Sequence, residues 1–480
     1  MDKEYEFLSN YINKEIIAIP NQLNEQIYFN GNKFKPRDEF NLIKGYIDDF
    51  LNGNPFNRFL VLPGLRSVGK STLLFQVYDY LLRQKQIAPN QILYFSCEDL
   101  NYLGNYNIKE VVDLYLKEQH EKELRTLNKH IFLLIDESQY DKNWAFAGKI
   151  IYDKTRKVFM IFTGSSALNL ESNADAARRM MKININPLTY NQHLELKYNL
   201  SLNKSNYLEK LIFEGDINDI SKYEYEINTK LTNTLDYTYD DWNNYFKYGG
   251  FPTLFYINNM HEQQMRLTDI IYKIIYNDLP NIRNFTTENQ TNVFRLLSFL
   301  ALQRSNDISY EKISKHLQTS KVNVKNILDT LEKTHLIFHI ESYGTSSKRM
   351  KKAWKYYFAT SSLKNAIVSM LGNTSIQKQE YEVILLENYI ASILHNLINK
   401  NIYQYMYYDS NKENVDFLVK KEFENPIPIE VGRGKKDKKQ VKTAMNKYDS
   451  PHGIIISNTT TKIHKEDEII YIPHKTFSLI

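Results

Sequence analysis

The fold of this chain is decided by one short stretch, which reads Gly64-Leu65-Arg66-Ser67-Val68-Gly69-Lys70-Ser71. It fits the pattern G-x-x-x-x-G-K-[ST] at every position, and the apolar run Phe59–Leu62 leads directly into it. A run of helical character, Thr72–Tyr78, follows. Strand, loop and helix in this order are the context of a phosphate-binding loop. A chance Gly-rich turn is the alternative, and the flanking strand and helix disfavour it.

The residue types of this loop suit a bound phosphate. Glycines allow backbone N–H groups to turn inward, and the N-terminus of the following helix adds partial positive charge. Lys70 is expected to reach the β- and γ-phosphates, and the Ser71 hydroxyl to ligate Mg²⁺. We predict that the nucleotide is contacted by Gly64, Arg66, Ser67, Val68, Gly69, Lys70, Ser71 and Thr72.

A second motif lies at the end of the apolar run His130–Ile135, which has the pattern of a strand buried on both faces. It closes with Asp136 and Glu137. Ligands of open α/β folds bind at the carboxyl ends of parallel strands. We therefore expect Asp136 to support Mg²⁺ and Glu137 to polarise the attacking water. A solvated acidic strand end is the alternative for this motif taken alone.

Length and composition set the class of protein. The chain has 480 residues, so several domains are expected. Its formal net charge is only +5, and any nucleic-acid role depends on local basic patches. The single cysteine, Cys97, excludes an intramolecular disulfide and a zinc cluster. No apolar run is long enough for a bilayer, and Met1–Glu6 is unlike a signal peptide, so we expect a cytoplasmic protein without a membrane partner.

The order of strands and helices predicts an α/β fold with a parallel sheet. Strands are expected at 59–63, 91–97, 131–136, 157–163 and 182–186. We divide the chain into an N-terminal arm or short helices (1–33), a P-loop core (34–190), a helical lid (191–290), a winged-helix domain (291–360) and a C-terminal α/β domain (361–480).

The winged-helix prediction rests on element order. Helical spacing over Glu311–Leu317 and Lys321–Lys333 is followed by two strand-like runs, Leu336–Ile340 and Trp354–Phe358. Helix, turn, helix and a two-stranded wing is the order of that fold. Another small α+β packing unit is the alternative.

Taken together, these residues resemble the prokaryotic AAA-like P-loop ATPases that carry a C-terminal restriction-endonuclease-like domain of the PD-(D/E)XK type. The resemblance spans nearly the whole chain after residue 30. It is carried by the P-loop, Ile92–Leu100, Leu134–Gln139 with Trp144, Phe162–Ser166, Asn186–Thr189 and Tyr248–Pro252.

The resemblance implies further nucleotide contacts. Ser165 or Ser166, at the end of a strand, is placed to sense the γ-phosphate. Pro252 belongs to a G-x-P lid motif that approaches the base and ribose, and Arg37 matches an upstream arginine near the nucleotide. The alternatives are a self-satisfied turn at 164–166, a tight interhelical turn and a surface arginine.

The resemblance also implies an arginine supplied to a neighbouring subunit, and hence a homo-oligomer. The family places Gly-Arg after the sensor, whereas this chain reads Ala176-Ala177-Arg178-Arg179. Either Arg178 or Arg179 is the candidate, and a solvent-exposed pair is the alternative.

For the C-terminal domain, the resemblance implies a nuclease-like site of Glu387, Asp416 and Glu430. In such nucleases the carboxylates hold Mg²⁺ and a lysine follows two residues after the last of them. Here that position is Gly432, so an inactive nuclease fold and an active one both remain open.

Two basic stretches, Lys348–Lys352 and Arg433–Lys439, indicate DNA as a partner, with a solvated charge run as the alternative. The sequence thus predicts an ATPase that uses ATP and Mg²⁺ and couples nucleotide state to a module that engages DNA. A slowly hydrolysing signalling switch and an ATP-gated DNA nuclease are the alternatives.

Overall fold

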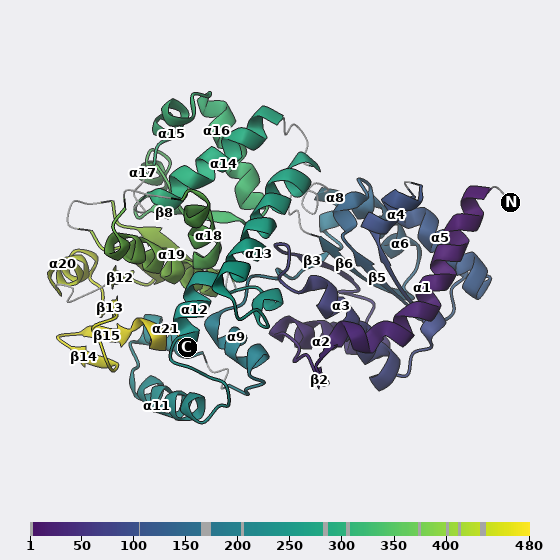
Figure 1. Ribbon diagram of the computed structural model, residues 1–480, viewed down its shortest axis with the longest axis horizontal. Coiled ribbons are helices and arrows are strands. Elements are labelled where there is room, and N and C mark those ends of the chain that lie inside the picture. Colours follow the sequence, from purple (N-terminus) through teal and green to yellow (C-terminus); the bar gives the residue numbers. More distant parts are fainter. Residues whose placement is uncertain are drawn as a thin grey trace. The chain divides into compact units, whose positions relative to one another are not determined.

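The computed structural model describes residues 3–104, 106–164, 174–202, 206–281, 287–303, 308–372, 376–399, 403–410, 414–432 and 438–480. The chain forms two compact units, Met1–Asn186 and Pro187–Ile480, and each is described by itself. Figure 1 follows the chain from the purple N-terminal helix to the yellow C-terminal strands.

The first unit is built on a five-stranded sheet in the order β4-β5-β6-β3-β7, in which every pairing is parallel. Strands β3 and β5 are buried along their whole length, as their continuous apolar sequence requires when helices cover both faces. A parallel sheet with covering helices fits the P-loop NTPase fold. The strands are β3 (Phe59–Pro63), β4 (Ile92–Ser96), β5 (Ile131–Asp136), β6 (Val158–Gly164) and β7 (Met181–Lys182).

The predicted strands are confirmed with small shifts at their ends. The fifth, predicted over 182–186, is a two-residue strand that continues as an extended segment. Ile183 N donates to Val61 O over 2.9 Å, and Ile185 N donates to Pro63 O over 2.8 Å. This segment therefore follows β3 toward the P-loop.

The first unit begins with a helix rather than an arm. Helix α1 (Lys3–Ile27) packs on β4, α3 and α5, with Leu8, Ile12 and Leu23 fully buried. Its mixed charges and the internal Pro20 hide this apolar stripe in the sequence. The other elements of the unit are β1 (Tyr28–Phe29), β2 (Asn32–Lys33), α2 (Asp38–Leu51), α3 (Lys70–Asp79), α4 (Cys97–Leu103), α5 (Ile108–His120), α6 (Trp144–Lys154), α8 (Ala174–Ala177) and short turns at 80–84, 89–91, 124–126 and 138–140.

The second unit opens with helices. They are α9 (Tyr190–Lys197), α10 (Tyr207–Glu209), α11 (Asn218–Thr232), α12 (Asp241–Tyr248), α13 (Met260–Lys273) and α14 (Thr287–Leu302), with short helical turns at 210–214, 252–254, 274–278 and 279–281. Helices α15 (Tyr310–Leu317) and α16 (Lys321–Lys333) follow, and each starts at a serine whose hydroxyl caps the first turn.

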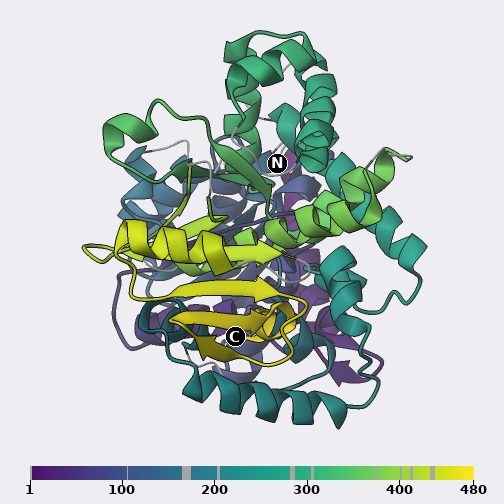
Figure 2. The ribbon, with the colours of Figure 1, turned by 90° about the vertical axis from the view of Figure 1, so that its left-hand side faces the viewer.

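A mixed sheet of eight strands in the order β14-β15-β13-β12-β11-β10-β8-β9 forms the rest of the second unit. Figure 2 shows its yellow C-terminal strands facing the viewer. The hairpin β8–β9 belongs to the same sheet, because β8 pairs with β10 in parallel. The elements are β8 (Ile337–Ser342), α17 (Ser346–Arg349), β9 (Lys355–Phe358), α18 (Ser361–Met370), α19 (Lys378–Ile398), β10 (Gln404–Tyr408), β11 (Phe417–Lys421), β12 (Ile427–Gly432), α20 (Lys438–Tyr448), β13 (Gly453–Ser457), β14 (His464–Glu466), β15 (Ile469–Pro473) and α21 (His474–Leu479).

This sheet places the C-terminal carboxylates. Strands β10, β11 and β12 run antiparallel, and β13 pairs with β12 in parallel after α20. The register pairs Phe417 with Ile429, so Asp416 and Glu430 lie at neighbouring positions of adjacent strands. Helix α19, which carries Glu387, contacts β9, β10 and β12.

Candidate nucleotide site

The P-loop leaves β3 and enters α3 through a turn that only certain residues accept. A Cβ on Gly64 would lie 2.3 Å from the Ile185 carbonyl oxygen, so this position requires glycine. Ser67 (φ 62°) and Gly69 (φ 95°) both adopt left-handed backbone. Gly69 caps α3, and the helix therefore begins at Lys70.

Lys70 is folded back over the loop. Its Nζ donates to Gly64 O over 3.0 Å and to Leu65 O over 2.9 Å, and the residue is only 5% exposed. The predicted phosphate-binding ammonium is thus held inside the loop by the loop's own carbonyl groups.

Asp136 is the buried centre of the site. Its Oδ1 accepts from the Thr163 hydroxyl and from Glu137 N at 3.0 Å, and its Oδ2 accepts from the Tyr94 hydroxyl at 3.3 Å. Burial and then the Glu137 charge raise the pKa of Asp136, while hydrogen bonds with Ser71 and Thr163 and the Lys70 charge act to lower it. The P-loop and the acidic strand end therefore meet, as the sequence predicts.

Glu137 turns away from the strand in left-handed backbone (φ 49°). Its N–H also lies 3.3 Å from Thr163 Oγ1, and its Oε2 accepts from the Gln139 side-chain amide. The Ser138 hydroxyl donates to Thr163 O over 2.6 Å and fixes this turn to β6. The carboxylate predicted to act as base is consequently held by a neighbour on its own turn.

Three residues that the sequence analysis did not single out bond directly to this pair: Tyr94, Gln139 and Thr163. Thr163 carried the clearest signal, since it is the one polar side chain in β6 and stands at the buried end of that strand. The predicted sensor Ser166, with its alternative Ser165, lies outside the described residues.

Arg37 and Arg66 differ in their contacts. Arg66 Nη2 donates to the Tyr140 hydroxyl over 3.3 Å on the half-buried rim of the loop. Arg37 is 6% exposed and donates to the backbone oxygens of Val68 and Asn186. Both residues lie at the P-loop, and their contact with nucleotide stays a prediction.

Arg178 and Arg179, the two candidates for an arginine supplied to a neighbouring subunit, differ in their contacts. Arg179 Nε donates to Asp153 over 2.6 Å, and its Nη1 lies 3.4 Å from an Asp175 carboxylate oxygen. Arg178 is exposed and has no ion pair within the described ranges. A role for either arginine in a neighbouring subunit stays a prediction.

Pro252 belongs to the second unit, where it starts a short turn beside Gly250 (φ 96°). Leu188 N donates to Gly250 O over 2.8 Å, which ties this turn to the start of the unit. The predicted approach of Pro252 to the nucleotide stays a prediction.

Glu387 of α19 accepts a hydrogen bond of 2.9 Å from the Tyr357 hydroxyl. Burial and then the Asp416 charge raise its pKa to about 7. Lys364, 1% exposed, has a pKa lowered to about 8 by burial. Asp416 Oδ2 accepts from Val431 N at 2.8 Å.

The three C-terminal carboxylates, Glu387, Asp416 and Glu430, do not form a metal site in this arrangement. Across the described ranges, no group of three or more His, Cys, Asp or Glu side chains is placed to hold a metal ion. Glu430 itself is buried in β12. Glu387 and Asp416 are nevertheless close enough for the Asp416 charge to raise the pKa of Glu387, and the nuclease-like role of the three carboxylates stays a prediction.

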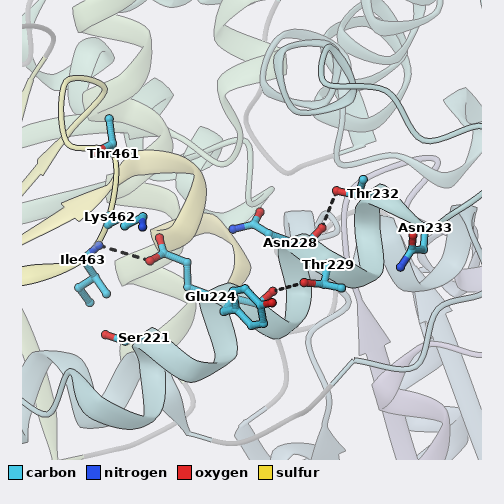
Figure 3. Close-up of a pocket in the computed structure, with 10 residues that line it drawn as sticks. Ser221, Glu224, Asn228, Thr229, Thr232, Asn233, Thr461, Lys462 and Ile463 are labelled. Carbon is cyan, nitrogen blue, oxygen red and sulfur yellow. Dashed lines mark hydrogen bonds between the residues drawn. The ribbon is translucent and has the colours of Figure 1, made fainter.

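A separate cavity of about 540 Å³ lies beside α11 (Figure 3). The Thr229 and Thr232 hydroxyls donate to carbonyl oxygens of their own helix. Glu224 accepts from Ile463 N at 3.3 Å across the cavity. No residue of the predicted sites lines this cavity.

None of the described helices is long and apolar enough to cross a membrane.

Comparison with known proteins places this chain. The uncharacterized protein MJ1637 of Methanocaldococcus jannaschii is 31% identical over 476 residues, which cover 98% of this chain and 94% of that protein. This chain belongs to the MJ1637 family. An uncharacterized protein of Haemophilus influenzae is 25% identical over 71% of this chain and 77% of its own length.

Two models of known domain families match parts of this chain. An AAA domain matches residues 56–194, which contain the P-loop and the acidic strand end, and a domain of unknown function (DUF8612) matches 239–376. The first unit therefore carries an AAA-type P-loop domain.

Among solved structures, AMPPCP-bound DnaA from Aquifex aeolicus is 14% identical over 63% of this chain and 90% of its own, with a TM-score of 0.26. C. elegans PCH-2 is 12% identical over 65% and 74%, also with a TM-score of 0.26. The assignment to an AAA domain rests on the sequence matches.

Proposed function

We propose that this protein binds ATP together with Mg²⁺ and hydrolyses it, and that its second unit uses the nucleotide state to engage DNA. The observation that carries the proposal is the meeting of the two motifs at the end of β6, where Gly64 N of the P-loop donates to Gly164 O over 3.2 Å and the neighbouring Thr163 hydroxyl donates to Asp136. It brings the predicted phosphate-binding and acidic motifs to one edge of the sheet.

The donor atoms at this edge suit magnesium. Ser71 offers a hydroxyl and Asp136 a carboxylate, and Mg²⁺ prefers oxygen ligands, with substrate phosphates completing its shell. These two residues would hold the ion, which when bound supplies positive charge to the phosphates.

The remaining roles follow from the contacts. Lys70, already directed into the loop, binds the phosphate oxygens. Glu137 accepts the proton of the attacking water, while Thr163 fixes both the Asp136 carboxylate and the Glu137 backbone. Arg178 serves the site of a second subunit in a homo-oligomer.

The second unit supports a role with DNA through its element order and charge. Helices α15 and α16 followed by the β8–β9 hairpin have the winged-helix order, and α16 exposes Lys321 and Lys325. Lys351 and Lys352 are exposed in the segment between the two strands. Such lysines bind phosphates in a salt-dependent way.

We propose that the restriction-endonuclease-like module binds DNA without cutting it. Glu387 on a helix, Asp416 beside β11 and Glu430 in β12 follow the order that the resemblance implies. The absence of a three-carboxylate metal group across the described ranges favours binding over cleavage.

A slowly hydrolysing switch is the second candidate, and one contact favours it. The Gln139 amide holds the carboxylate of Glu137, which a fast base would need to release. Steady-state turnover with and without DNA separates a switch from a motor.

The proposal is tested by phosphate release from ATP in the wild type, in Lys70→Ala and in Lys142→Ala, an exposed lysine of the same unit. We expect Mg²⁺-dependent turnover in the wild type and in Lys142→Ala, and none in Lys70→Ala. Equal turnover in all three would contradict the proposal.

A further inference from the structure

Arg37 precedes α2, and every nitrogen of its guanidinium donates a hydrogen bond to another group of the protein. Nη1 donates to Val68 O and Nη2 to Asn186 O, each over 2.7 Å. Nε and Nη2 each lie 3.2 Å from a carboxylate oxygen of Glu39. The fork geometry of arginine matches such a set, whereas a lysine ammonium does not.

The contact with Val68 fixes one peptide plane of the P-loop. In a trans peptide the carbonyl of one residue and the N–H of the next point in opposite directions. Arg37 holds the Val68 carbonyl on its own side, so the Gly69 N–H points away from Arg37. Val68 lies between the left-handed residues Ser67 and Gly69, where the plane would otherwise be free to turn.

The contact with Asn186 fixes the end of the first unit. The segment before it follows β3 through Ile183 and Ile185, and the Ile185 carbonyl occupies the space that a side chain on residue 64 would need. The chain then passes covalently into the second unit at Pro187. One guanidinium thus joins the P-loop to the exit of its domain.

We propose that Arg37 is a positioning residue of the nucleotide site, which aims the Gly69 N–H into the phosphate cradle and ties the loop to the Asn186–Pro187 junction. The inference rests on the proposed nucleotide function. It needs no contact between Arg37 and the nucleotide, because the guanidinium acts through the Val68 carbonyl.

The test compares Arg37→Lys with the wild type. The lysine keeps the charge but reaches only one of the two carbonyls, so the cradle loses its preorganisation. We expect the Kd for a non-hydrolysable ATP analogue with Mg²⁺, and the KM for ATP, to rise about 10- to 100-fold. The kcat at saturating ATP should stay within about threefold, since the reacting groups are untouched.

Arg58→Lys is the matched control. Arg58 is 3% exposed, belongs to the same unit, and bonds the Tyr152 carbonyl at 2.8 Å. It should change thermal stability without moving KM. Glu39→Gln keeps the arginine but weakens its anchor, and should raise KM by about threefold; it also serves if Arg37→Lys does not fold.

Hydrogen exchange adds a readout at the junction. In the wild type, nucleotide should slow exchange at the amides of Ile183, Ile185 and Leu188, and Arg37→Lys should lose most of that protection. Unchanged affinity in both Arg37→Lys and Glu39→Gln, or a fall in kcat at constant KM, would overturn the inference alone. A wild type that binds no nucleotide would overturn the proposed function as well.

Discussion

The P-loop site and the C-terminal carboxylates are two predicted sites with different surroundings. In the first unit, Gly64 and Asp136 come from motifs far apart in sequence, and both bond to the end of β6, through Gly164 O and the Thr163 hydroxyl. In the second unit, Glu387 bonds Tyr357 and Asp416 bonds the Val431 backbone, so each carboxylate has a protein partner of its own. Parallel pairing of β3, β6 and β5 brings the first set together, whereas the second set depends on how α19 packs on its sheet.

The charge around the two buried acids differs in the same way. Asp136 faces the Lys70 ammonium and two hydroxyls, Ser71 and Thr163, which offset part of its burial. Glu387 faces another acid, Asp416, and its pKa rises to about 7. The first arrangement offsets part of the cost of a buried charge, while the second lowers stability at neutral pH.

The largest expected effect is on the base of the first site. Glu137→Gln should lower ATP turnover by about 10³-fold, because the amide cannot accept a proton, and should leave nucleotide binding intact. Phosphate release and analogue binding measure the two parts. Glu121→Gln, at an exposed helix end, is the control. Turnover above a tenth of the wild-type rate would remove Glu137 from its role.

The second effect concerns the pair of arginines. Arg178→Ala should lower turnover by at least about 10²-fold at protein concentrations that support assembly. The reason is that the positive charge of the arginine, which stabilises the transferred phosphate, is lost. Arg179→Ala should instead lower the melting temperature, since it breaks the ion pair with Asp153. Turnover assays and thermal unfolding of both variants decide; a reversed pattern would assign the finger to Arg179.

A smaller effect is expected at Thr163. Thr163→Val keeps the shape of the side chain but removes the hydroxyl that bonds Asp136 and receives the Glu137 N–H. We expect turnover to fall by about 10- to 100-fold. Thr232→Val, whose hydroxyl bonds only its own helix, should have no effect. Wild-type turnover in Thr163→Val would show that Asp136 needs no such support.

The smallest expected effect concerns Glu387 of the second unit and the pH dependence of stability. The pKa of Glu387 is raised from 4.5 to about 7, so the folded state binds this proton more tightly than the unfolded chain. The free energy of unfolding therefore falls as the pH rises from about 4.5 to about 7, and the loss persists above that.

Glu387→Gln should thus stabilise the protein by about 3 kcal/mol at pH 8.5 and give no gain at pH 4. Denaturant unfolding at the two pH values measures this, with the exposed Glu424→Gln as control. An equal effect of Glu387→Gln at both pH values would contradict the assigned shift.

The sequence predicts most of the first unit because its signals are local. The run from Phe59 to Tyr78 specifies strand, turn and helix in one contiguous stretch. The continuous apolar run of β5, which ends in acidic residues, predicts a buried strand. Helix α1 is harder to predict from the sequence, because charged residues and Pro20 interrupt its apolar stripe.

Other parts of the site could not be predicted from local patterns. The bond from Thr163 to Asp136 depends on β6 lying beside β5, and the contact of Arg37 with Val68 depends on packing between α2 and the P-loop. In the second unit, β8 joins β10 across a long stretch of chain, so the hairpin and the C-terminal strands make one sheet. Such partners come from tertiary packing rather than from the pattern around each residue.

Calorimetric titration of the full chain with a non-hydrolysable ATP analogue and Mg²⁺ tests the central claim most directly. The account predicts saturable binding of one nucleotide per chain, weakened at least about 100-fold by Lys70→Ala and unchanged by Lys142→Ala. Absence of binding in the wild type at millimolar nucleotide, or equal binding in Lys70→Ala, would contradict it.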